Sequence, residues 1–210
     1  MTQAERGRNT GHAGPQTART PRRQTAAPGT AESPEARVRA ARVRLLALDV
    51  DGTLTSGQLF IGPTGEAMKA FSVRDGFGLR LLREAGVHLA IVTARNSSIV
   101  RTRAAELRIE TLHQGAADKA QVLRELSREH GLDLAECAFA GDDWPDLAAM
   151  TIAGFAAAAT DAATEVRACA HWVSTLPAGQ GAMRELAEFI LRAKGRFEPA
   201  LLGYRGGGNR

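Results

Sequence analysis

The chain has little cysteine and no long apolar segment. Its 210 residues include two cysteines, Cys137 and Cys169, which form no C-x-x-C pair and lack the spacing of a metal site. No apolar run approaches the roughly 18 residues that cross a membrane. The N-terminus also lacks the apolar core of a secretory signal peptide. These absences argue against a disulfide scaffold and a membrane protein, and they favour a cytoplasmic protein with free thiols.

Charge is unevenly distributed along the chain. Residues 1–44 hold nine arginines against three glutamates, a net charge of +6, which leaves −2 for the rest of this +4 chain. The basic composition is therefore poor evidence that the folded part binds nucleic acid. Residues 1–36 are rich in Arg, Pro and Thr without a helix or strand period, and we predict a disordered tail. A start codon placed too early, a dispensable tail, and a basic arm for nucleic acid or an anionic surface are the three alternatives.

After residue 42, short apolar runs alternate with helical patterns. The runs expected to be buried strands begin near residues 43, 87, 109, 137, 154 and 171. The expected helices span residues 75–85, 97–107, 119–130, 144–150, 162–169 and 182–194. Asn96 is a candidate N-cap of the second helix. Residues 56–72 interrupt the alternation, and two short strands around Gly62-Pro63-Thr64-Gly65 predict a β-hairpin there.

This alternation predicts an α/β fold. Continuous apolar strands separated by helices are typical of a parallel sheet covered on both faces, a Rossmann-like three-layer αβα sandwich. We expect the domain to span residues 37–198, with a projecting hairpin, and residues 199–210 to form a flexible C-terminal tail.

Four clusters of polar residues each follow a predicted strand, at its C-terminal end. They are Asp49-x-Asp51-Gly52-Thr53, Thr93, Lys119, and Gly141-Asp142-Asp143 with Asp146. Ligands of a parallel sheet bind at the carboxyl ends of its strands, so we expect the clusters to meet at one edge. Carboxylates packed together repel one another and need a cation, and Mg²⁺ suits a few carboxylates with water and a phosphate.

The set D-x-D-G-T, Thr, Lys, G-D-D-x-x-D resembles the haloacid dehalogenase superfamily of phosphotransferases. The resemblance implies that Asp49 is the nucleophile that attacks phosphorus and becomes an aspartyl phosphate. Asp51 would protonate the leaving oxygen and then take a proton from water. It further implies that Mg²⁺ binds Asp49, the backbone carbonyl of Asp51, and Asp142.

The same resemblance assigns the remaining polar residues. Thr93 and Lys119 would bind the transferred phosphoryl group. Asp143 and Asp146 would support the metal site and orient Lys119. The two intervals between these motifs, residues 53–93 and 119–142, are too short for the cap domain that many members of the superfamily carry.

Longer stretches resemble one family within this superfamily. They are GEAMKAFSVRDGFGLRLLREAGVHLAIVTAR, HQGAADK, AFAGDDWPDLAAM and AGQGAMRELAEFIL. Over residues 43–198 the chain resembles the capless 3-deoxy-D-manno-octulosonate 8-phosphate phosphatases. The resemblance implies a magnesium-dependent phosphoric monoester hydrolase that forms the free sugar acid for lipopolysaccharide synthesis. It also implies a homotetramer in which the hairpin of one subunit closes the site of its neighbour.

Arginine is suited to the substrate's carboxylate because its guanidinium binds carboxylates bidentately. Arg74 and Arg95 are the candidates, and an ion pair between subunits is the alternative for each. Three departures from the family pattern bear on the sugar: Ala94 replaces a usual glycine, Gln180 replaces a usual arginine, and the tail after Phe197 has its own sequence. A phosphatase for a nine-carbon, sialic-type sugar acid 9-phosphate therefore stays an alternative, as does a non-catalytic tetrameric scaffold.

Other residues have simpler interpretations. Gly76-Phe77-Gly78 lacks the third glycine of a dinucleotide fingerprint, so we do not assign a nucleotide site. Asp75 is expected to cap the helix that follows it. His113 and Trp144 are expected to serve in packing or at an interface.

Overall fold

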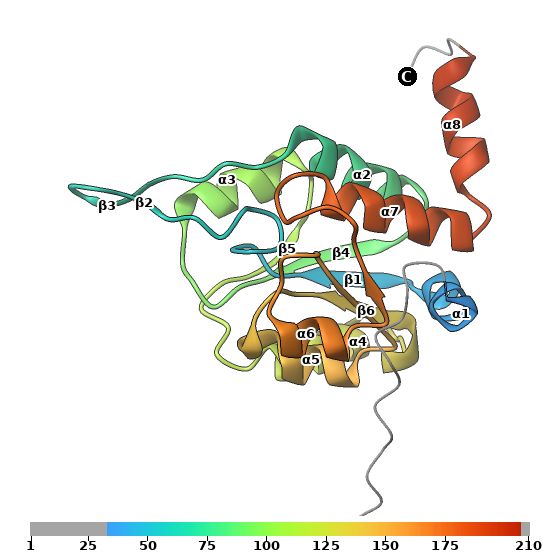
Figure 1. Cartoon of the computed structure of the whole chain (residues 1–210), viewed down its shortest axis with the longest axis horizontal. Helices are drawn as coiled ribbons and strands as arrows, with labels where there is room; N and C mark the ends of the chain where they lie inside the picture. The colour runs from blue at the N-terminus through green and yellow to red at the C-terminus, as the bar shows by residue number, and fades with distance from the viewer. Residues whose placement is uncertain (1–32, 207–210) are drawn as a thin grey trace, which may run out of the picture.

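The apolar runs form one sheet of six parallel strands, as their alternation with helices predicted (Figure 1). The computed structural model describes residues 33–206, so residues 1–32 of the predicted tail and the last four residues lie outside it. In sheet order the strands are β5 (Thr111–His113), β4 (His88–Val92), β1 (Leu45–Leu48), β6 (Cys137–Ala140), β7 (Phe155–Ala158) and β8 (Trp172–Val173).

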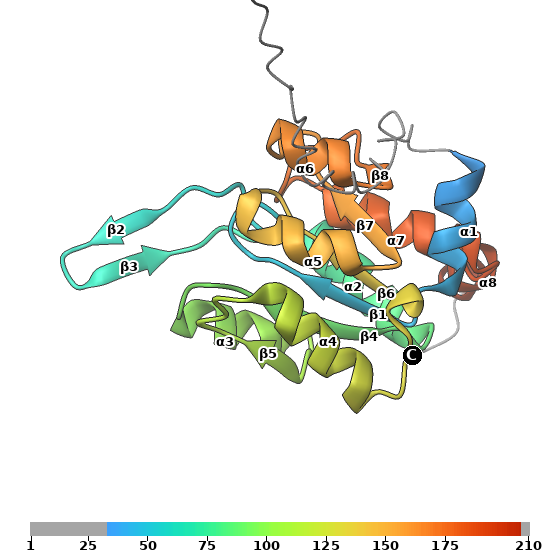
Figure 2. The same ribbon diagram turned by 90° about the horizontal axis from the view of Figure 1, so that it is seen from below.

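Helices cover both faces of this sheet, which gives the expected three layers (Figure 2). One layer contains α1 (Pro34–Arg42), α2 (Val73–Glu84), α3 (Ser98–Glu106) and α7 (Ala182–Ala193). The other contains α4 (Lys119–Glu129), α5 (Leu147–Ile152) and α6 (Thr164–Cys169). The remaining elements are α8 (Phe197–Arg205) and the 3₁₀ turns η1 (Leu134–Glu136) and η2 (Trp144–Asp146). In the described part of the chain, no helix has the length and apolar character needed to span a bilayer.

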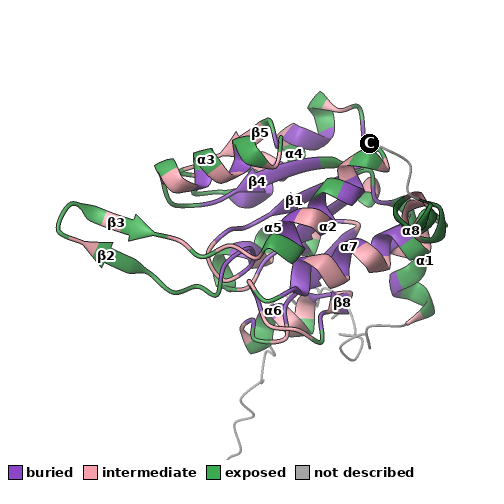
Figure 3. Ribbon diagram, turned by 90° about the horizontal axis from the view of Figure 1, so that it is seen from above, coloured by how far each residue is buried: buried purple, intermediate pink, exposed green. Residues whose placement is uncertain are grey.

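Alternate residues of each strand point to opposite layers. Leu46 and Leu48 of β1 belong to the core on the α2 and α7 side, whereas Leu45 and Ala47 belong to the core on the other side. Every residue of β1, β6 and β7 is buried, which explains why these three strands are apolar throughout; β1 is coloured as buried in Figure 3. Each fully buried leucine stabilises the fold by about 1.5–3 kcal/mol.

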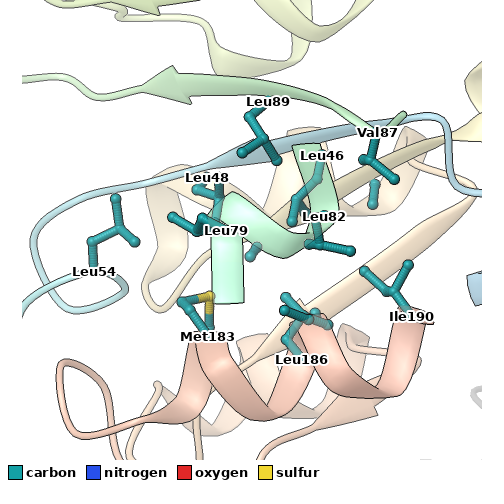
Figure 4. Close-up of a cluster of buried hydrophobic side chains, with 14 of the residues drawn as sticks. Leu46, Leu48, Leu54, Leu79, Leu82, Val87, Leu89, Met183, Leu186 and Ile190 are labelled. Atoms are coloured by element: carbon teal, nitrogen blue, oxygen red, sulfur yellow. The ribbon is translucent and has the colours of Figure 1, made fainter. Parts of the chain in front are cut away.

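The helices α2 and α7 pack closely over β1. Leu79 and Leu82 point from α2 toward Met183 and Leu186 of α7 (Figure 4). A Cβ at Gly78 would lie 2.9 Å from the Cα of Arg184, so only glycine allows this approach. The short glycine motif in α2 therefore serves helix packing.

The predicted hairpin projects from the body as β2 (Phe60–Gly62) and β3 (Gly65–Met68) (Figure 1). It lies between β1 and α2 in the chain and forms a separate two-stranded antiparallel sheet, the only strands of the described residues outside the six-stranded sheet. Apolar side chains remain in solvent on it, with exposed fractions of 46% for Leu59, 41% for Phe60 and 66% for Ile61. A monomer has no core that could bury them.

Several boundaries differ from the predicted ones. Helix α1 begins at Pro34, inside the expected tail, and α8 extends to Arg205 where an irregular tail was expected. The N-cap of α3 is Ser97, whose hydroxyl accepts the N–H of Val100, and not Asn96. The helix expected over residues 144–150 is split into η2 and α5 because Asp143 and Asp146 cap each other's backbone there.

Asp75 caps a helix, but not the one that follows it, so this prediction was wrong. Ser72 caps α2, and the buried carboxylate of Asp75 accepts the N–H groups of Gly181 at 3.3 Å and Arg184 at 2.8 Å. Asp75 therefore caps the first turn of α7, more than 100 residues away in the sequence. This contact fixes the α2–α7 pair at the end of the sheet where the polar clusters lie.

We expect Asp75→Ala to lower the free energy of unfolding by roughly 1–3 kcal/mol, because it leaves two buried N–H groups without an acceptor. Burial raises the pKa of Asp75 in spite of its hydrogen bonds, which shows that its charged form is poorly solvated. Removing the carboxylate removes this desolvation penalty and offsets part of the lost stability. Urea unfolding would measure the change. Glu84→Ala, at an exposed ion pair on the same helix, is the control, and an equally small change in both variants would contradict the prediction.

Candidate active site

The site lies at the carboxyl ends of β1, β4 and β6. The chain leaves β1 to build β4 and β5 on one side and returns to build β6 on the other, so the strand order reverses between β1 and β6. A crevice forms at such a reversal. Asp49 follows β1 there, and Asp142 follows β6 two residues after its end.

Lys119 joins two of the predicted site residues. It is the first residue of α4, and its Nζ lies 3.0 Å from Asp49 Oδ1 and 2.6 Å from Asp146 Oδ1. The lysine side chain is only 4% exposed. Burial would lower the pKa of Lys119, but the two carboxylates outweigh burial and raise it, so the lysine stays protonated.

Asp146 is fully committed to hydrogen bonds. Its Oδ2 accepts the N–H groups of Asp142 at 3.0 Å and Asp143 at 3.3 Å, while its Oδ1 faces Lys119. It therefore holds the loop after β6 and orients the lysine. Although Asp49, Asp142 and Asp146 offer oxygens within 4.8 Å of one another, Asp49 and Asp142 are the better metal ligands because those of Asp146 are engaged.

Gly52 lets the loop after β1 approach Asp142. Its φ is +88°, and a Cβ would lie 2.0 Å from Asp142 Oδ2, so no other residue fits without moving the carboxylate. Thr53 in the same loop donates its hydroxyl to Asp142 Oδ1 at 3.0 Å. The D-x-D-G-T motif thus fixes Asp142 as well as its own two carboxylates.

The carboxylates are poorly neutralised by the protein alone. Desolvation, with Asp146 nearby, raises the pKa of Asp49 to about 6 even though Lys119 opposes the shift. Desolvation together with Asp49 and Asp146 raises the pKa of Asp142 to about 7. Two desolvated hard oxygen donors that share one crevice suit a divalent cation such as Mg²⁺. The donor set therefore fits the predicted metal.

We expect Asp142→Asn to stabilise the metal-free protein at about pH 8, by roughly 1–3 kcal/mol after allowance for partial solvent screening. The folded-state pKa is raised, so ionisation of Asp142 lowers stability as pH rises from about 4 through about 7. Mg²⁺ favours the ionised form, so it should stabilise the wild type at about pH 8 and much less at about pH 5.

Thermal unfolding with EDTA and with millimolar MgCl₂ at both pH values would measure these effects. Glu110→Gln, which removes an exposed carboxylate outside the crevice, is the matched control. Equal stabilisation of wild type and Asp142→Asn by Mg²⁺ would contradict the assignment of Asp142.

Asp51 contacts residues that the sequence did not reveal as part of the site. Its Oδ1 pairs with Lys69, which also lies 2.8 Å from Glu66 Oε1. Ser97 donates its hydroxyl to the other oxygen of Glu66. Arg95 faces the same carboxylates, with Nε 3.6 Å from Asp51 Oδ2 and Nη2 3.8 Å from Glu66 Oε1. Lys69 and Glu66 lie in the segment 65–95 that resembles the family, but only the folded hairpin brings them to Asp51.

The other predicted residues take different positions. Thr93 is 3% exposed at the end of β4, where its N–H donates to the backbone carbonyl of His113 at 2.9 Å. Asp143 is exposed and caps η2 through the N–H of Trp144. The indole of Trp144 is 65% exposed and donates to Glu165 at 3.1 Å. His113 therefore contacts Thr93 through its backbone carbonyl.

Arg74 is separated from the carboxylates of the crevice. It is exposed at the start of α2, and a Cβ at Gly181 would lie 3.9 Å from its Cζ. Within residues 33–206 no ion pair of Arg74 is found. The loop with Gln180 lies next to it, and a Cβ at Gly179 would be 2.8 Å from the backbone N of Ser56. Arg74 therefore lies at the rim, beside the loop that follows the first motif.

The chain matches known proteins over most of its length. A family model described as haloacid dehalogenase-like hydrolase matches residues 109–186. The 3-deoxy-D-manno-octulosonate 8-phosphate phosphatase of Yersinia pestis is 38% identical over 162 residues, which are 77% of this chain and 87% of that protein.

Solved structures give the same result. The phosphatase of this name from Moraxella catarrhalis, in complex with magnesium, phosphate and the sugar acid, is 39% identical, with a TM-score of 0.79 over 81% of this chain and 98% of that one. The cobalt-bound phosphatase from Haemophilus influenzae is 35% identical, with a TM-score of 0.74 over 76% and 93%. The chain belongs to the 3-deoxy-D-manno-octulosonate 8-phosphate phosphatase family of haloacid dehalogenase-like hydrolases.

Proposed function

We propose that this protein hydrolyses 3-deoxy-D-manno-octulosonate 8-phosphate to the free sugar acid and inorganic phosphate. The carboxylate of Asp49 attacks phosphorus and the bond from phosphorus to the sugar oxygen breaks, which forms an aspartyl phosphate. Asp51 gives its proton to the departing sugar oxygen. It then takes a proton from water, which attacks phosphorus and frees Asp49.

The surrounding residues neutralise and orient the reacting groups. Lys119, held by Asp146, faces the negative oxygens of the phosphoryl group, and Thr93 offers its hydroxyl and the backbone beside it. Asp49, Asp142 and the backbone carbonyl of Asp51 would hold Mg²⁺. When bound, the metal would offset the charge of the carboxylates and the phosphoryl oxygens.

The observation that carries this proposal is the buried contact of Lys119 with Asp49 at 3.0 Å, opposite Asp142, in a chain of this family. A nucleophile beside a fixed cation and a metal-binding carboxylate is the arrangement that phosphoryl transfer needs, because positioning and charge cancellation supply most of the rate. A scaffold would have no use for these desolvated charges.

Phosphate release from the eight-carbon 8-phosphate, with and without Mg²⁺, tests the proposal. The nine-carbon sialic-type 9-phosphate is assayed beside it. We expect fast, metal-dependent release from the eight-carbon substrate. Preference for the nine-carbon substrate would mean that Ala94 and Gln180 mark a different pocket, and no release from any sugar phosphate would favour the scaffold alternative.

We further propose that the protein is a homotetramer in which each hairpin closes a neighbouring site. The hairpin projects from the body and carries the exposed Leu59, Phe60 and Ile61 (Figures 1 and 3). No cap covers the crevice within the described chain, so another subunit must exclude water from it. The substrate's carboxylate would then meet Arg95, with Arg74 at the rim.

We expect Ile61→Ser to shift the molecular mass in solution from tetramer to smaller species and to reduce turnover at the same protein concentration. The reason is that a hydroxyl replaces an apolar side chain at the subunit contact. Sedimentation equilibrium measures the mass. Leu202→Ser, which changes an equally exposed leucine on α8, is the control, and a monomeric wild type or a tetrameric Ile61→Ser variant would contradict the proposal.

A further inference from the structure

Lys69 is a buried cation at the base of an exposed hairpin. It follows β3, where Met68 is 59% exposed, yet the lysine side chain itself is 1% exposed. Its ammonium group pairs with Asp51 and lies 2.8 Å from Glu66 Oε1. Because a buried charge is costly unless it is paired, these two carboxylates determine where the lysine goes.

Glu66 holds the lysine from the hairpin side. Its Oε2 accepts the hydroxyl of Ser97, the residue that caps α3. Desolvation would raise the pKa of Glu66, but hydrogen bonds from Lys69 and Ser97 outweigh it and lower the pKa. The ammonium group is therefore fixed between a carboxylate anchored to α3 and the carboxylate of Asp51.

The two oxygens of Asp51 have different surroundings. Oδ1 receives the hydrogen bond from Lys69. Oδ2 is buried and has no hydrogen-bond partner among the described residues, and Nε of Arg95 lies 3.6 Å from it. The hydrogen bond from Lys69 restrains rotation of the carboxylate about the Cβ–Cγ bond, so the oxygen that Lys69 does not hold stays on the other side.

We propose that Lys69 is a positioning residue that holds Asp51 through Oδ1 and leaves Oδ2 as the oxygen that exchanges protons with the leaving group and with water. The inference rests on the proposed function of Asp51. Lys69 contacts neither the nucleophile nor the metal ligand Asp142, so its effect falls on the proton-transfer steps. Because Lys69 belongs to the hairpin segment, it also links the catalytic acid to the element that would contact a neighbouring subunit.

The test compares two leaving groups in Lys69→Met, which keeps the length of the side chain and removes its charge. For 3-deoxy-D-manno-octulosonate 8-phosphate we expect kcat to fall about 10- to 100-fold, the usual effect of losing a positioning contact, with KM changed less than about threefold. p-Nitrophenolate leaves without a proton, so p-nitrophenyl phosphate should still transfer its phosphoryl group to Asp49. Hydrolysis of the aspartyl phosphate then becomes limiting, and p-nitrophenol should appear as a burst of one equivalent per subunit before slow turnover.

Two controls and one further variant accompany this test. Lys194→Met makes the same change at the far end of α7, where the lysine donates to the carbonyl of Ala41, and should keep wild-type rates. Asp49→Asn should give no burst. Glu66→Gln, which weakens the anchor of Lys69, should lower kcat in the same direction by a smaller factor.

An unchanged kcat in Lys69→Met overturns the inference, as does loss of the burst, which would indicate a damaged site. A raised KM with unchanged kcat also overturns it, because Lys69 would then bind substrate. If the wild type releases no phosphate from either compound with Mg²⁺, the proposed function fails first; if the wild type is active and Lys69→Met behaves like it, only the role of Lys69 fails.

Discussion

Asp49→Asn should reduce phosphate release by roughly 10⁴-fold or more and leave the protein folded. The amide cannot attack phosphorus, and removal of a covalent nucleophile costs this much or more in other enzymes. The fold should survive because Lys119 keeps its contact with Asp146 at 2.6 Å. The variant also loses a carboxylate whose desolvation raises its pKa to about 6, so it should be no less stable than the wild type without metal.

Steady-state phosphate release measures the loss of activity, and thermal unfolding measures whether the variant stays folded. Glu110→Gln is the comparison, because Glu110 is exposed and lies outside the crevice. Turnover by Asp49→Asn within tenfold of the wild type would rule out Asp49 as the nucleophile. A variant that is inactive because it is unfolded would show in the thermal transition.

Lys119→Met should have the second largest effect, on stability as well as activity. It removes the only cation within ion-pair distance of Asp49 in the described chain and leaves Asp49 and Asp146 as unpaired, desolvated carboxylates. Breaking a buried pair in this way costs about 3–5 kcal/mol in the metal-free protein. Loss of a cation that faces the transferred phosphoryl group should reduce kcat about 10³-fold.

The double variant Lys119→Met with Asp146→Asn separates the two effects. It removes one of the unpaired charges, so it should recover part of the lost stability without recovering activity. Urea unfolding and kcat measure them independently. A single variant as stable as the wild type would contradict the stabilising role of the Lys119 ion pairs. A double variant that regains activity would contradict the action of Lys119 on the transferred group.

The strands and the order of the motifs could be predicted because both depend on local pattern. Runs such as those around Leu46 and Ile91 are apolar throughout, which in a short segment indicates a strand buried on both faces. Once the strands are parallel, their carboxyl ends lie at one edge, so Asp49 and Asp142 had to approach each other. The register that puts Leu48 beside Ala140 then determines their separation.

The terminal helices show where local pattern was insufficient. Helix α1 carries Ser33 as N-cap, Pro34 at its first position and Glu35 in its first turn, signals that the basic composition of the surrounding segment obscured. Helix α8 contains Pro199 and Gly203, which disfavour a helix. The helix nevertheless forms. The guanidinium of Arg192 lies over the ring of Phe197, and the ring centroids of Tyr204 and Phe77 are 5.4 Å apart.

By itself the sequence determined the class of fold and predicted the carboxylates of the crevice and the lysine beside them. The reason is that these follow from strand periodicity and from residues just after a strand or at the start of a helix. Tertiary structure alone decided that Asp75 caps α7 and that Lys69 and Glu66 hold Asp51. These contacts join segments whose spacing in the chain has no fixed period. A buried charge goes to whichever opposite charge the fold brings within reach, and no local pattern specifies that partner.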